Sequence, residues 1–397
     1  MSNSNILVVN MAQIEAPKVK ETPGKDWLSF GDNNLFPQEL IDYCNTSALH
    51  NAIIQSKTEQ AFGNGLSYEG KEGDLPTDEF INQANPTESL NDVLLKAIKD
   101  YNIHGGFALN IVWGSGFKKI SEIYHVDFSR IRVGKLDERG NPDKYYYCTD
   151  WASQRKAGVK EIIPFNQKDK SDASQLIYFK PYQPGLSGYP LPNYMGALTY
   201  IAIDGEVANL HLSNLKNGMI PSVLINFSNG EPTEDEQKTI EKKIKSKFTG
   251  TDNAGKFVLT FSLDKEHSPD VIPLTTNDID KQYIQLNNMV LQNILSGHRI
   301  TSPLLVGIKT EGQLGGNNEL YTAYRIHIST VIEPIKKSVM SVINELGKVN
   351  NIQELFLLPN DPIEFTLSEN VLEKILTEEE LRSLVGYGPK ELDKPVV

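Results

Sequence analysis

The stretch from Leu191 to Leu346 constrains the fold most, because it predicts helices whose narrow apolar stripes need helical partners. A first helix is expected over 191–218, where apolar residues recur close to every 3.5 positions until an Asn-Gly pair ends the pattern. A second helix within 274–300 repeats this spacing, so we expect the two helices to pack together. Amides dominate the other face of the second helix: Gln282, Gln285, Asn287, Asn288, Gln292 and Asn293.

A small insert, residues 219–273, separates these two helices and predicts a strand, a helix and a strand. The helix is expected over 233–248, where Thr233 and Glu236 fit a capping box and lysines gather toward the C-terminal end. This charge distribution is typical of a solvated helix that matches its own dipole. The alternative is a charged docking face for a partner protein, with Lys238, Lys242 and Lys245 as its candidate residues.

A polar loop and a very long helix follow the second helix. The region 301–318 includes four glycines, one cation (Lys309) and one anion (Glu311) between Gly307 and Asn318, which predicts a flexible connection. Helical periodicity then runs over 319–347. Pro334 lies in its middle, so we expect this helix to kink or to divide into two segments.

The first half of the chain, residues 31–190, predicts helices followed by a mostly antiparallel sheet, so the fold class is α+β. Helical spacing covers 36–62 and 89–101, and 1–30 is expected to be a flexible arm. Residues 348–397 predict two strands, an acidic helix and a Gly-Pro tail. Short runs rich in Val, Ile, Tyr and Phe predict strands at 107–113, 120–124, 130–133, 144–148 and 175–179.

Composition argues against several classes of protein. A formal net charge of −12 disfavours a protein that holds nucleic acid by attracting many phosphates. Cys44 and Cys148 form no ligand cluster, so we expect two buried core thiols in a reducing compartment. No run approaches 18 apolar residues and no signal peptide is predicted, so we expect a soluble protein without a membrane partner.

No sequence motif supports catalysis. Gly250 to Lys256 matches much of a Walker A loop, but Phe257 occupies the place of the magnesium-binding hydroxyl residue, and the loop follows a predicted helix instead of a strand. The seven histidines include no pair at metal-ligand spacing. The tyrosine run 145–147 is expected in a core or an interface rather than stacked on bases. We therefore predict that the protein is not an enzyme and needs no cofactor or metal.

A series of short motifs resembles the portal proteins of tailed bacteriophages over about residues 27–388. No single motif is decisive, and the resemblance rests on their order. They are, along the chain, Ile103-His-Gly-Gly-Phe-Ala-Leu-Asn110, Asp127-Phe-Ser-Arg130-Ile-Arg-Val133, Gly185-Leu-Ser187, Asn217-Gly218 with Pro221-Ser222, Asn253-Ala-Gly-Lys256, Ile300-Thr-Ser-Pro303-Leu-Leu-Val-Gly307, Asn317-Asn318-Glu319 and Ile332-Glu333-Pro334.

The resemblance implies a homo-oligomer, a dodecameric ring at one capsid vertex through which double-stranded DNA enters and leaves. It further implies docking of the large terminase subunit and of the head-tail adaptor, contact with the major capsid or scaffold protein, assembly in the host bacterial cytoplasm and a final place in the virion. The chain would divide into a wing (31–190 and 319–347), a stem (191–218 and 274–300), a clip that docks partners (219–273) and a reduced crown (348–397).

The resemblance also implies which residues face DNA. The channel wall of the stem would carry Gln282, Gln285, Asn288 and Gln292. An uncharged wall suits a duplex that must slide, because every Lys or Arg that binds a phosphate adds a release cost and salt dependence. In the region 301–318, the resemblance implies a tunnel loop that faces DNA, with the residues Lys309, Glu311, Gln313, Asn317 and Asn318. The alternative for this region is a plain surface connection.

Two other functions stay open from the sequence. A nucleotide-binding enzyme of DNA packaging would require residues 250–256 to bind nucleotide. A generic capsid or adaptor subunit would have the same helices but no DNA channel.

Overall fold

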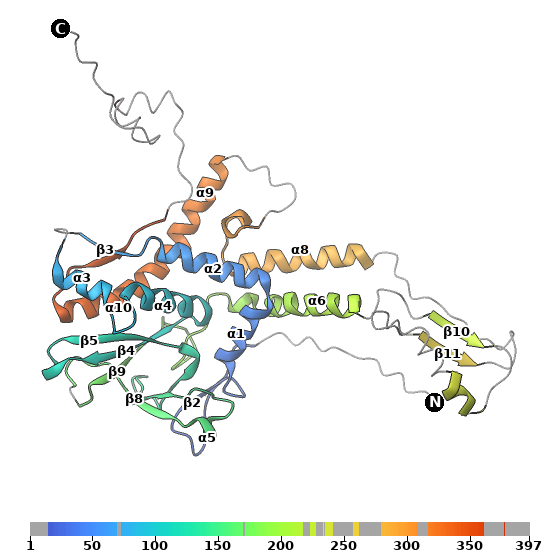
Figure 1. The fold of residues 1–397 in the computed structure, drawn as a ribbon, viewed down its shortest axis with the longest axis horizontal. Helices are drawn as coiled ribbons and strands as arrows, with labels where there is room; N and C mark the ends of the chain where they lie inside the picture. Colours follow the sequence, from blue (N-terminus) through green and yellow to red (C-terminus); the bar gives the residue numbers. More distant parts are fainter. Residues whose placement is uncertain are drawn as a thin grey trace, which may run out of the picture.

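A body of helices packed on a sheet carries a long arm of two helices in the computed structural model (Figure 1). The arm leaves the body on the side of α2, and a small strand pair lies near its far end. The structure describes residues 15–69, 73–169, 171–216, 223–227, 233, 235–240, 257–261, 279–308, 317–360 and 377.

The body is built on a six-stranded sheet with the strand order β5-β4-β9-β8-β7-β6. Neighbouring strands are antiparallel, except that β8 runs parallel to β9. Five of the six strands were predicted, and β8 was not, because its short Lys-Glu-Ile-Ile-Pro sequence is half exposed and gains its strand form from its two neighbours. The strands are β4 (Phe107–Trp113), β5 (Ile120–Val126), β6 (Ile131–Val133), β7 (Tyr145–Tyr147), β8 (Lys160–Pro164) and β9 (Ser174–Phe179).

Helices cover one face of this sheet (Figure 1). The N-terminus of α4 is fixed by a capping box between Ser89 and Asp92, and its end is set by Gly105 in the left-handed conformation. Leu94, Ala97 and other residues of α4 pack in one core with β4 and β5. The body helices are α1 (Phe36–Thr46), α2 (Ala48–Phe62), α3 (Leu75–Asn82), α4 (Leu90–His104) and the short α5 (Gln154–Ala157). Helix α3 lies between the two ranges with predicted helical spacing, 36–62 and 89–101.

Strands β1 (Val19–Glu21) and β2 (Leu28–Phe30) pair as an antiparallel hairpin before the first helix. The ring of Phe30 stacks on Tyr189 at 4.1 Å, and the Tyr189 hydroxyl donates to the Leu28 carbonyl oxygen. The expected flexible arm over 1–30 is therefore too long, because the part from β1 onward is folded onto the body. Two buried aromatic side chains, distant in sequence, hold it there.

Arg132 on β6 connects α1 to the sheet from a fully buried position. Its guanidinium donates to Asn34, to the Gln38 side chain and to the carbonyl oxygens of Ser129 and Ile131, and it lies 4.8 Å from the Trp151 ring. Burial lowers the pKa of Arg132 to about 10, so the side chain stays charged at neutral pH. Several acceptors thus stabilise one cation without any carboxylate.

The long helix predicted over 319–347 divides as expected. Its parts are α9 (Asn317–His327), a π-helical turn (Ile328–Ile332) and α10 (Glu333–Asn350). Pro334 is the second residue of α10 and follows directly on the π-helical turn, so the hydrogen bond that a proline cannot make is missing where the helix changes from π to α. The π-helical turn interrupts the regular α-helical hydrogen-bond pattern between α9 and α10. Helix α9 leaves the body in a different direction from α10 (Figure 1). Beyond α10, β12 (Leu355–Leu357) pairs with β3 (Leu66–Tyr68).

The arm consists of α6 (Leu198–Lys216) and α8 (Ile279–Gly297), which lie side by side (Figure 1). Both helices lie within the predicted ranges, but α6 begins at Leu198 instead of 191, because a 3-10 turn at Met195–Ala197 precedes it. Between them in sequence, β10 (Val223–Phe227) and β11 (Phe257–Phe261) form a parallel pair, and residues 235–240 are helical. A parallel pair joined by a helix is the expected strand-helix-strand insert. The mixed helix and sheet content confirms the predicted α+β class.

Candidate functional site

The base of the arm is packed tightly against the body. Leu198 and Ile201 of α6 and Val290 and Ile294 of α8 are at most 3% exposed. Gly297 permits this approach, because a Cβ there would overlap the Cβ of Ala197. A hydrogen bond of 2.6 Å from the Ser47 hydroxyl to Asp204 ties α6 to the junction of α1 and α2. The arm therefore starts from a defined position.

The face of α8 that points away from α6 carries three of the predicted wall residues. Gln285, Asn288 and Gln292 are exposed and, at 3.6 residues per turn, lie opposite the buried Val290 and Ile294. No charged residue occurs from Gln282 to Gly297. We call Gln285, Asn288 and Gln292 the amide strip. The Gln282 side chain lies outside the described residues.

Apolar side chains border the amide strip. Ile284 is 60% exposed and Met289 is 47% exposed, and helical geometry places them on opposite sides of the strip. On α6, Leu212 continues the stripe of Ile201 three turns further out and is 49% exposed. Two helices alone cannot cover these side chains. An exposed apolar border next to a polar strip is typical of a surface that packs against another protein.

The other predicted site residues receive little description from the structure. Asn317 and Asn318 start α9, but their side chains are not described, and Lys309, Glu311 and Gln313 lie outside the described residues. The tunnel-loop assignment stays a prediction.

The predicted docking face in the insert is described only at its start. Lys238 is exposed on the helical residues 235–240, whereas Lys242 and Lys245 lie outside the described residues. The Glu236 carboxylate accepts hydrogen bonds from the Thr233 backbone N–H and hydroxyl, and these bonds lower its pKa. This arrangement supplies one half of the predicted capping box.

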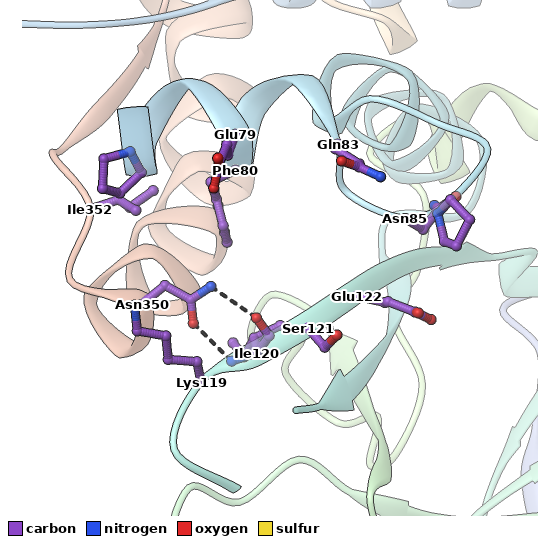
Figure 2. A pocket seen from close by; sticks show the side chains of 12 residues that line it. Glu79, Phe80, Gln83, Asn85, Lys119, Ile120, Ser121, Glu122, Asn350 and Ile352 are labelled. Atoms are coloured by element: carbon purple, nitrogen blue, oxygen red, sulfur yellow. Dashed lines mark hydrogen bonds between the residues drawn. The ribbon is translucent and has the colours of Figure 1, made fainter. Parts of the chain in front are cut away.

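A groove of about 460 Å³ runs between α3, β5 and the end of α10 (Figure 2). The Asn350 side chain lies at its floor, where its amide accepts from the Ile120 N–H at 2.8 Å and donates to the Ile120 carbonyl oxygen at 3.0 Å. The Ile123 N–H donates to the Ala84 carbonyl oxygen, and the Asn85 side chain donates to the Ile123 carbonyl oxygen. The outer backbone groups of the edge strand at Ile120 and Ile123 are therefore satisfied, which closes the first half of this edge to an added strand.

A second hollow, beside β5 and β7, is lined by His125, Asp127 and Arg130 among other residues. His125 contacts Asp100 at 2.8 Å, and Arg130 contacts Asp127 at 3.2 Å. Within the described ranges, no three His, Cys, Asp or Glu side chains are placed to hold a metal ion. Both cysteines are free and buried, as predicted. Every helix in the described part of the chain is too short or too polar to cross a membrane.

A cluster of basic side chains at the base of the arm was not predicted from the sequence. His50 and Lys57 of α2 are buried together with His298, which directly follows α8, and His327, the last residue of α9. The ring nitrogens of His50 and His298 lie 2.8 Å apart. These residues are far apart in sequence, and only the placement of His50 and Lys57 seven positions apart on one helix hinted at a shared face.

Comparison with known proteins gives a family and a shared fold. A family model described as "Phage portal protein" matches residues 58–356. The "Probable portal protein" of Haemophilus phage HP1 (strain HP1c1) is 22% identical over 185 residues, which cover 46% of this chain and 52% of that protein. The chain spans about half the length of the curated relatives it matches.

Among solved structures, a chain in the neck of an empty gene transfer agent particle, computed with C6 symmetry, matches with a TM-score of 0.54 and 15% identity. The match covers 90% of this chain and 95% of that one. A chain in the neck of the native particle, computed with C12 symmetry, matches with a TM-score of 0.51 and 16% identity over 89% and 95% of the two chains. At such identities the likeness establishes the fold.

Proposed function

Because this chain belongs to the phage portal protein family, we propose that it forms a ring-shaped channel at one capsid vertex, through which double-stranded DNA is packaged and ejected. The observation that carries the proposal is the outer face of α8, where the amide strip is bordered by exposed apolar side chains. The strip would line the bore. The borders would contact neighbouring copies.

The chemistry of the amide strip suits a passage for DNA. Amide groups form weak, exchangeable hydrogen bonds with water and with phosphate oxygens, whereas a lysine or arginine releases counterions when it binds a phosphate and holds the duplex more tightly. The strip therefore touches a sliding polyanion without trapping it. The net charge of −12 adds to this behaviour by limiting tight, non-specific binding elsewhere on the chain.

The exposed apolar side chains favour a ring of identical copies. Ile284 and Met289 border the strip on both sides, so neighbours packed on both flanks would cover them while the strip stays open to solvent. A closed ring is the arrangement in which every copy has two such neighbours. The similar neck chains come from reconstructions with C6 and C12 symmetry, which supports a dodecamer.

The remaining parts of the proposal concern partners. We expect the insert 219–273 to dock the large terminase subunit during packaging and the head-tail adaptor afterwards, with the body facing the major capsid or scaffold protein. Packaging energy would come from the terminase. The tunnel loop 309–318 would contact the duplex, and deleting Gln313 to Gly316 should leave rings intact but impair packaging or DNA retention; wild-type packaging by this deletion would contradict the loop assignment.

Electron microscopy and native mass measurement of the purified chain test the proposal. Rings with an open axial hole and a dodecamer mass are expected. Closed discs without a hole would favour a generic capsid or adaptor subunit, and a compact monomer would contradict the proposal. Incubation with labelled ATP tests the packaging-enzyme alternative, which requires saturable binding that Lys256→Ala abolishes.

A further inference from the structure

Four buried basic residues meet where the arm joins the body. His50, Lys57, His298 and His327 are each at most 3% exposed, and they come from α2, from the residue after α8 and from the end of α9. We call these four residues the basic joint. None of these residues belongs to the proposed channel wall, tunnel loop or docking face.

The hydrogen bond between His50 and His298 requires a proton on only one of the two facing ring nitrogens. His50 Nδ1 and His298 Nε2 lie 2.8 Å apart, so one of these nitrogens donates and the other accepts. The Tyr194 ring packs against both histidines, at 4.5 Å from His50 and 4.8 Å from His298, and its hydroxyl donates to the Ile103 carbonyl oxygen. When both rings carry two protons, both facing nitrogens become donors. The bond is then lost and two cations face each other.

The charges around the histidines oppose their protonation. Lys57 on α2 and Arg299 after α8 are the cations next to them, and burial together with Lys57 lowers the pKa of His50 to about 3. The same causes lower the pKa of His298 well below its ordinary value and that of His327 to about 4.

No carboxylate in the described residues compensates these histidines. For His327, the group that favours the protonated ring is the backbone of Arg299, which carries no charge. Asp204 reaches the joint only through Ser47, whose hydroxyl donates to it and accepts from the His50 backbone N–H. The joint is thus stable with neutral histidines and unstable with charged ones.

The basic joint lies on a mechanical connection. The turn after α8 is held to α2 by hydrogen bonds from Ser56 and Gln60 to the Leu305 carbonyl oxygen. The Thr301 hydroxyl donates to the Ala323 carbonyl oxygen on α9. The π-helical turn begins directly after His327. Any loss of the histidine contact therefore acts on α8, on the turn 298–308 and on α9 together.

We propose that the basic joint is a proton-sensitive coupling, which fixes the arm to the body at neutral pH and releases it on acidification. A released joint exposes the histidines to water, where their pKa returns to about 6.5. The released form then binds more protons than the fixed form below that pH. Each further pH unit favours release about tenfold for each histidine, until the lowered pKa of the fixed form is reached.

Fluorescence energy transfer between the arm and the body measures this release. Labels would be placed on the exposed positions Asn209→Cys of α6 and Glu138→Cys of the body, since the two native cysteines are buried. We expect the transfer efficiency to be constant from pH 8 to 7 and to change steeply by pH 5. A circular dichroism spectrum that keeps its helical signal shows that the body stays folded through this change.

The decisive variant combines His50→Gln with His298→Gln, which keeps a hydrogen-bonding pair but removes its protonation. This variant should lose the steep pH response. His104→Gln is the matched control, because His104 is also buried with a lowered pKa but packs on Phe128, away from the arm. It should keep the response. An unchanged pH profile in the double variant would overturn the proposal, as would constant transfer in the wild type down to pH 5.

A second variant keeps the test valid if the double variant misfolds. Lys57→Met removes the cation that opposes protonation of the histidines in the fixed joint, so protonation favours release less and the transition should move to lower pH. An unrelated packing defect would change the transfer efficiency at every pH instead. A transition that stays at the wild-type pH, or moves to higher pH, would contradict the electrostatic origin of the release.

Discussion

The body and the arm differ in how completely they bury their apolar side chains. In the body, Ile53, Ile98 and Ile343 are completely buried within one chain. Along the arm, burial is high at Ile294 next to the body and falls outward, so that Ile284 is 60% exposed. A structure that leaves such side chains exposed gains little stability from them alone. The body therefore buries its core within one chain, whereas the outer arm exposes apolar side chains that only other molecules can cover.

The largest expected effect separates assembly from folding. Ile284→Asp combined with Met289→Asp should abolish rings, because charges would replace the apolar borders of the amide strip, while the melting temperature of the single chain stays close to the wild-type value. Native mass measurement checks the assembly. Gln285→Glu adds a charge within the strip and should still form rings. Rings in the double variant would show that the borders are not contacts.

The next effect concerns the body. Arg132→Ala leaves the acceptors around the guanidinium unpaired and buried, so the free energy of unfolding should fall by about 3–5 kcal/mol. Urea unfolding measures this loss. Arg139→Ala removes the same side chain from an exposed loop and should change stability by less than about 0.5 kcal/mol. Equal losses in both variants would mean that Arg132 contributes no more than a surface residue.

A pair of truncations compares the two regions directly. Ile343→Ala on α10 should lower the free energy of unfolding by about 2–4 kcal/mol, because the cavity lies in the fully buried core. Leu212→Ala on the outer arm should lower it by less than about 0.5 kcal/mol in the unassembled chain. Chemical unfolding of both variants under conditions that prevent assembly tests the comparison. A large loss for Leu212→Ala would show that the arm has its own core.

The smallest expected effect is a gain in the free energy of unfolding. Burial lowers the pKa of Lys57 from 10.5 to about 8, so the folded state is disfavoured while this lysine is charged. Lys57→Met should raise the free energy of unfolding at pH 7 by about 1–3 kcal/mol. The cost is fully present below pH 8 and disappears as the pH rises through 10.5, so the gain should shrink over that range. Lys99→Met, at an exposed site of α4, should give no such gain at any pH.

Regular spacing made much of the fold predictable. The 3.5-residue repeats located α6 and α8, and Pro334 located the break before α10. Strand β4 was predicted with its exact bounds, because its alternating and buried residues follow directly after the Gly-Gly pair that ends α4. In each case one local signal, a period or a helix-ending residue, carries the information.

The missed features depend on contacts between distant residues. Strand β8 has a weak sequence of its own and forms between β7 and β9. The β1–β2 hairpin is held by Tyr189, about 160 positions later, through the bond to Leu28. His50 and His298 are separated by 248 positions, and no periodicity relates them. The amides of α8 could be read from the sequence, but their place between two exposed apolar borders required the packing of α8 on α6.

Asn350 blocks part of the edge of β5, which matters when many copies of the chain lie side by side. Any assembly that brings many copies side by side raises the local concentration of sheet edges, and an open edge would recruit a strand from an adjacent molecule. One asparagine side chain, which mimics the peptide group of a missing partner strand, occupies the outer bonds at Ile120. Copies that stand close together therefore cannot add a strand to β5 at Ile120.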